Sequence, residues 1–71
     1  MAAADITSLN NMLRTSKGNL SRLIKTAESN ITLMGNYPSP SGVTQLQFVQ
    51  TQINKTMDNI ESIFLELRNV D

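Results

Sequence analysis

The segment Gly35-Asn36-Tyr37-Pro38-Ser39-Pro40-Ser41-Gly42 decides the fold, because it is the one break between two long segments with helical periodicity. A glycine at the end of a helix readily takes the left-handed conformation that closes it. Prolines lack the amide hydrogen that a continuing helix needs. Two amphipathic segments joined by one such break are typical of an antiparallel helical hairpin.

The expected fold is all-α, with both helices in a single domain over residues 1–71. The first helix is predicted at about 5–34, the turn at 35–42 and the second helix at about 43–69. Asp5 is expected to cap the first helix, and Ser41 or Thr44 the second, because oxygen side chains accept from free backbone amides at a helix start.

Each segment carries an apolar stripe at spacings of three, four and seven residues, which indicates coiled-coil-like packing of the two helices. The first stripe is Ile6, Leu9, Leu13, Leu20, Leu23, Ala27, Ile31 and Met34, and the second is Leu46, Val49, Ile53, Met57, Ile60, Ile63, Phe64, Leu67 and Val70. Ser16 and Thr56 interrupt the stripes. The residues expected to hold the hairpin together are Leu9, Leu13, Leu20, Leu23, Ile53, Ile60, Ile63 and Leu67.

The composition argues against chemistry and in favour of association. A chain of 71 residues buries too little apolar surface for comfortable stability, so such chains usually need a disulfide, a metal or a partner. The sequence has no cysteine and no histidine, which excludes disulfides, thiolate or imidazole metal sites and histidine-dependent catalysis. We therefore expect no enzyme and no cofactor. The expected partner is a second copy or another helical protein.

Five large apolar residues lie off both stripes: Met12, Ile24, Leu33, Phe48 and Leu65. The predicted second interface consists of Met12, Ile24, Phe48 and Leu65. A two-helix hairpin covers one side of each helix, so surplus apolar positions indicate a further packing surface. Ordinary scattered exposure is the alternative explanation for the same residues.

Charge divides the chain into two halves although the formal net charge is zero. The first helix is net +2, and the second is net −2 when Asp71 is included. If the turn centres near Ser39, Lys17 faces Glu61 and Arg22 comes near Asp58. Such pairs favour one antiparallel register over its alternatives.

The one local basic cluster offers a second function class. It consists of Arg14, Lys17, Arg22 and Lys25. These cations could contact phosphates of nucleic acid or of an anionic membrane, or they form an ordinary solvated helix face. No apolar run is long enough to span a membrane and the start lacks a signal peptide, so an intracellular, cytoplasmic protein is expected.

Short motifs in both helices give the chain a family resemblance. Lys17-Gly18-Asn19-Leu20-Ser21-Arg22, the Gln-rich stretch from Leu46 to Ile53, and Asn59-Ile60-Glu61 resemble the N-terminal helical segment of Gag-like polyproteins from Bel/Pao-type LTR retrotransposons. The resemblance covers about Leu13 to Leu67. It implies a structural role in helix-mediated particle assembly, with the basic stretch structural or close to RNA.

A second likeness is to the needle subunits of type III secretion systems. Those filament subunits are also small helical hairpins with a proline-bounded turn, similar to Pro38-Ser39-Pro40. This likeness implies a filament-forming protein.

Overall fold

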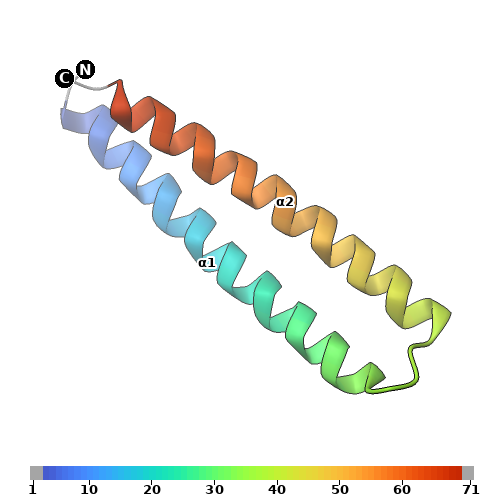
Figure 1. The fold of residues 1–71 in the computed structure, drawn as a ribbon. Helices are drawn as coiled ribbons and strands as arrows, with labels where there is room; N and C mark the ends of the chain where they lie inside the picture. Colours follow the sequence, from blue (N-terminus) through green and yellow to red (C-terminus); the bar gives the residue numbers. More distant parts are fainter. Residues whose placement is uncertain (1–2, 70–71) are drawn as a thin grey trace.

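The computed structural model describes residues 3–69, which form two long helices and the turn between them (Figure 1). Helix α1 spans Ala3–Met34 and helix α2 spans Pro40–Arg68. The helices lie side by side and antiparallel, in a rod with extents of 53 × 14 × 13 Å. The predicted all-α helical hairpin is confirmed.

Gly35 ends α1 as the sequence predicts. Its φ of 56° lies in the left-handed region, where a side chain would be strained. The amide of Gly35 donates to the carbonyl of Ile31 at 3.1 Å, and the amide of Tyr37 donates to the carbonyl of Met34 at 3.1 Å. These bonds satisfy carbonyls that the last turn of a helix otherwise leaves free.

Helix α2 begins earlier than expected, and neither Ser41 nor Thr44 is its cap. Ser39 holds that position in an extended conformation, and its Oγ accepts from the amide of Gly42 at 3.1 Å. Thr44 lies inside the helix, where its hydroxyl donates to the carbonyl of Pro40 at 3.0 Å. Proline suits the first helical position because no helical bond is lost there, so Pro40 starts α2 instead of delaying it.

The open end of the hairpin also departs from expectation. Helix α1 begins at Ala3, so Asp5 lies in its first turn and not at its cap. The carboxylate there still suits the positive end of the helix dipole. At the other end Asn69 is the C-cap of α2, and the predicted stripe residue Val70 lies outside the described residues.

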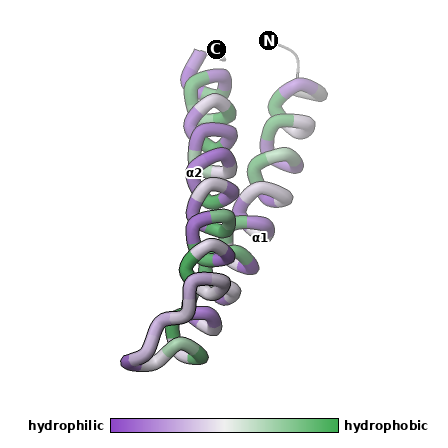
Figure 2. The backbone as a smooth tube through the Cα atoms, turned by 90° about the vertical axis from the view of Figure 1, so that its right-hand side faces the viewer, coloured by the Kyte–Doolittle hydropathy of each residue, from purple (hydrophilic) through white to green (hydrophobic). Residues whose placement is uncertain are grey.

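Buried and half-buried side chains recur in a seven-residue repeat along both helices. Hydrophobic and hydrophilic stretches alternate along each helix (Figure 2). The most buried side chains are Leu9, Leu13, Val49 and Ile63, each 5–9% exposed. Half-buried positions continue the repeat at Ile6, Ser16, Leu20, Leu23, Ala27, Asn30 and Met34 on α1, and at Gly42, Leu46, Ile53, Thr56, Ile60 and Leu67 on α2. All eight residues expected to hold the hairpin together are therefore buried or half-buried.

Three residues of the predicted stripes are exposed instead. Ile31, Met57 and Phe64 keep 55%, 53% and 51% of their surface in solvent. The stripes are wider than the seam that one neighbouring helix can cover, so their edges stay outside it.

The helices pair in a different register from the one expected. Leu9 and Leu13 pack with Ile63, and a Cβ built on Gly42 would lie 2.8 Å from Sδ of Met34. These pairs centre the turn near Tyr37 rather than Ser39, which moves each facing residue of α2 by about one helical turn.

Neither ion pair expected for a turn centred near Ser39 forms among the described residues. With the turn centred near Tyr37, Lys17 comes level with Asp58 rather than with Glu61. The guanidinium of Arg22 donates to Oδ1 of Asn19 within α1 instead of reaching Asp58.

Replacing Ser39 with alanine tests the cap of α2. The Ser39→Ala variant should lose about 1 kcal/mol of unfolding free energy, because the amide of Gly42 loses its acceptor. Urea unfolding followed by circular dichroism measures the loss. Thr44→Ala is the matched control and should change stability by less than about 0.5 kcal/mol; the opposite order would place the cap at Thr44.

Replacing Asn30 with leucine tests the cost of a polar group in the seam. Nδ2 of Asn30 is buried without a hydrogen-bond partner. Asn30→Leu should raise the unfolding free energy by about 1–2 kcal/mol, since an unsatisfied buried group is removed. The unfolding free energy of Asn30→Leu is measured by urea denaturation at one protein concentration and compared with that of the exposed Asn59→Leu, for which little change is expected. Equal changes in the two variants would contradict a cost that is specific to the seam.

Candidate interaction surface

The repeat assigns every side chain a place around the hairpin. We label the seven positions of this repeat a to g, so that the seam positions are a and d. Position a is held by Leu13, Leu20, Ala27, Leu46, Ile53, Ile60 and Leu67, and position d by Leu9, Leu23, Val49, Thr56 and Ile63. Positions e and g then flank the seam on its two sides. Because the helices are antiparallel, the e positions of both lie on one side of the hairpin and the g positions on the other.

Shallow hollows on the surface agree with this assignment. One is lined by Asp5, Ser8, Leu9, Met12 and Glu66, which brings g positions of α1 and α2 together. Another joins Asn30 and Leu33 to Gln45 near the turn, again with g positions from both helices.

The e side of the hairpin is strongly apolar. Ile24, Ile31, Val43, Met57 and Phe64 occupy it, and each is 39–55% exposed. We call these five residues the apolar flank. Within residues 5–69 the remaining helical e positions are Asn10, Lys17 and Gln50, so polar groups are in the minority on this side.

The g side is polar by comparison. It carries Asp5, Asn19, Thr26, Gln45, Gln52, Asn59 and Glu66, with Met12 and Leu33 as the two apolar members. Amide and carboxylate side chains are readily hydrated, so this polar flank needs no cover. The difference between the two flanks marks the e side as the candidate interaction surface.

Two open hollows lie along the apolar flank, one on each helix. The hollow on α1 measures about 350 Å³ and is lined by Lys17, Leu20, Ser21, Ile24, Lys25 and Glu28. The hollow on α2 measures about 420 Å³ and is lined by Met57, Asp58, Ile60, Glu61, Phe64 and Leu65. Two lysines and one glutamate edge the first, and two carboxylates edge the second.

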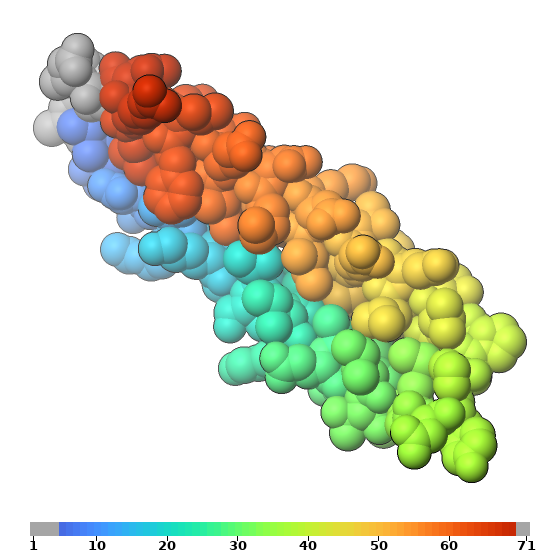
Figure 3. Space-filling model, in the orientation of Figure 1, coloured from blue at the N-terminus to red at the C-terminus, as the bar shows by residue number. Residues whose placement is uncertain are grey.

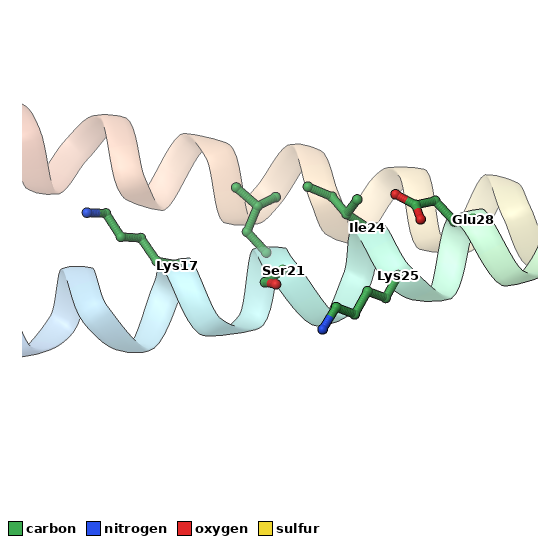
Figure 4. Close-up of a pocket in the computed structure, with 6 residues that line it drawn as sticks. Lys17, Ser21, Ile24, Lys25 and Glu28 are labelled. Atoms are coloured by element: carbon green, nitrogen blue, oxygen red, sulfur yellow. The ribbon is translucent and has the colours of Figure 1, made fainter.

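The hollows are shallow surface features. In Figure 4, Ile24 projects toward α2 while Lys25 points away from it. The space-filling view shows the two helices pressed together along the rod, with no deep cavity on the visible face (Figure 3). Such a surface can receive side chains of another helix, but it does not enclose a small molecule.

The four residues of the predicted second interface are all exposed but do not share one side. Ile24 belongs to the apolar flank and Met12 to the polar flank. Phe48 and Leu65 occupy positions c and f on the outer surface of α2. Sequence reasoning missed Ile31, Val43, Met57 and Phe64 as surface residues; their recurrence at position e is the signal that identifies them.

The basic cluster does not form one cationic patch. Arg14, Lys17, Arg22 and Lys25 are all exposed. Lys17 and Lys25 line the same hollow as Glu28, whereas Arg22 lies on the other side of α1 beside Asn19. The cations that share a surface are therefore accompanied by a carboxylate.

No group of three or more acidic, histidine or cysteine side chains is arranged to hold a metal ion within residues 3–69. Neither helix is apolar enough over its length to cross a membrane.

Comparisons of this chain with protein-family models, with curated proteins and with solved structures gave no match.

Proposed function

We propose that this chain is a non-enzymatic protein–protein interaction module that self-assembles through its apolar flank with coiled-coil-like packing. The supporting observation is the row of large apolar side chains at position e. Helices with apolar residues only at a and d suit a two-helix seam, whereas apolar residues at a, d and e suit a bundle with more helices. Both helices here show the wider pattern.

The small core of the hairpin supports the same proposal. Leu9, Leu13, Val49 and Ile63 are buried, and none of the described residues is less than 2% exposed. Covering the exposed half of one flank side chain, such as Phe64, contributes about 1 kcal/mol. Covering all five contributes about 5 kcal/mol per copy before the entropic cost of association is subtracted.

The resemblance to Gag-like polyproteins fits an assembly role and stays a prediction. Within such a polyprotein the hairpin would be the helical part that joins copies in a particle. The basic residues Arg14, Lys17 and Lys25 would then lie at the edge of the assembly surface, where structural and phosphate-proximal roles are both open. An intracellular, cytoplasmic site of action belongs to the same proposal.

Polar substitution on the apolar flank should abolish self-association. We expect Met57→Gln/Phe64→Gln to lower the molar mass from an oligomer to a monomer at micromolar concentration, as measured by light scattering across a concentration series. Met12→Gln/Leu33→Gln is the matched control, because these two residues are 52% and 85% exposed but lie on the polar flank. It should retain the oligomer, and circular dichroism checks that both variants remain helical.

The salt dependence of the same measurement separates assembly from phosphate binding. An apolar association should persist or strengthen at high salt. Binding to a fluorescent single-stranded RNA or to anionic vesicles through Arg14, Lys17, Arg22 and Lys25 should instead fall steeply with salt. A monomer at every concentration that binds either phosphate ligand at low salt would overturn the assembly proposal.

A further inference from the structure

The apolar flank fits a second copy of this chain in one particular arrangement. We propose that two copies stack flank against flank, with each α1 lying beside the partner's α2 and both turns at the same end. This inference rests on the proposed self-assembly and adds its geometry. The product is an antiparallel four-helix bundle with a core from positions a, d and e.

The size of the flank suits an interface between two copies. The hairpin is 53 Å long and 14 Å wide, so covering one side of it removes about 700 Å² of each copy from solvent, close to the 800 Å² per partner of a standard stable interface. A second hairpin of the same length can cover both hollows.

Symmetry fixes which residues meet in this arrangement. A two-fold axis parallel to the helices leaves every residue at the same height along the rod. The register of the hairpin, with Met34 facing Gly42 and Leu13 packed with Ile63, therefore also applies between α1 and the partner's α2. Near the turn, Ile31 then meets the partner's Val43, which gives an apolar layer of four side chains.

Charge favours this pairing over the stacking of like helices. Over its length α1 is net +2, from Arg14, Lys17, Arg22 and Lys25 against Asp5 and Glu28, whereas α2 is net −1, from Lys55 and Arg68 against Asp58, Glu61 and Glu66. Arg14 comes level with the partner's Glu61, and Lys17 comes level with the partner's Asp58. A two-fold axis perpendicular to the helices would instead place α1 on α1 and α2 on α2, so that helices of like net charge meet.

Thiol cross-linking of mixed single-cysteine variants tests the arrangement, since the native chain has no cysteine. Ser21 and Asn54 are exposed and lie at equal height on the e-side edges of α1 and α2. Mixed Ser21→Cys and Asn54→Cys chains should be joined by a short bismaleimide, because neighbouring helix axes in a bundle are about 8–10 Å apart. Ser21→Cys alone should give no cross-linked dimer, since two α1 helices are diagonal in the bundle.

The control is Lys55→Cys, which follows Asn54 directly and lies at the exposed position c on the outer surface of α2. Mixed with Ser21→Cys, it should give little product. Efficient linking of Ser21→Cys to itself in a dimer would overturn the proposed arrangement but leave self-assembly intact. Absence of any dimer by light scattering would overturn self-assembly as well, so the two failures are distinguishable.

Exchanging the charges of one predicted contact provides an independent test that does not depend on the length of a cross-linker. Arg14→Glu and Glu61→Arg should each weaken self-association about 3–10-fold, because both copies then present like charges at two contacts. An equimolar mixture should recover the native dissociation constant, since opposite charges meet again in the mixed dimer. Failure of the mixture to recover affinity, with each variant fully helical, would contradict the pairing of α1 with the partner's α2.

Discussion

Two helices can bury only the side chains that point at each other, and this limit shapes the whole molecule. Along α1 and α2 the seam takes positions a and d, and everything beyond them faces solvent. Leu9, Leu13 and Ile63 show what the limit permits, since they are 5–9% exposed and none is fully enclosed. A third neighbour on the e side is the simplest way to enlarge such a core, because the apolar residues needed for it are already present.

Polar residues within the seam limit the stability that the hairpin reaches alone. Thr56 satisfies its hydroxyl inside its own helix by donating to the carbonyl of Gln52 at 2.9 Å. Asn30 has no comparable solution, because its Nδ2 is buried without a partner. A buried amide of this kind weakens the seam, because it gives up its hydrogen bonds to water without replacing them.

The sequence predicts the hairpin well because its information is local and periodic. Gly35 needs only its own backbone conformation to end a helix, and the three-and-four spacing of leucines defines the seam without knowledge of the partner helix. The start of α2 is less determined, since Pro40 can end one helix or begin another, and only the bond from Gly42 to Ser39 decides between these roles. The register depends in turn on that start, so the predicted pairing of Lys17 with Glu61 missed by about one turn.

The apolar flank was harder to predict for a different reason. On a helical wheel Ile31, Met57 and Phe64 continue the seam stripe, so a wide stripe does not reveal where one neighbour stops and another begins. Only the observed burial separates position e from position a. The polar flank completes this logic: in the proposed dimer Asn19, Gln52 and Asn59 face outward and stay hydrated. Association through one flank therefore covers the continuous apolar row and leaves the polar flank free, with Met12, Leu33 and Phe48 as separate exposed apolar residues. This favours a closed pair of hairpins over continued growth.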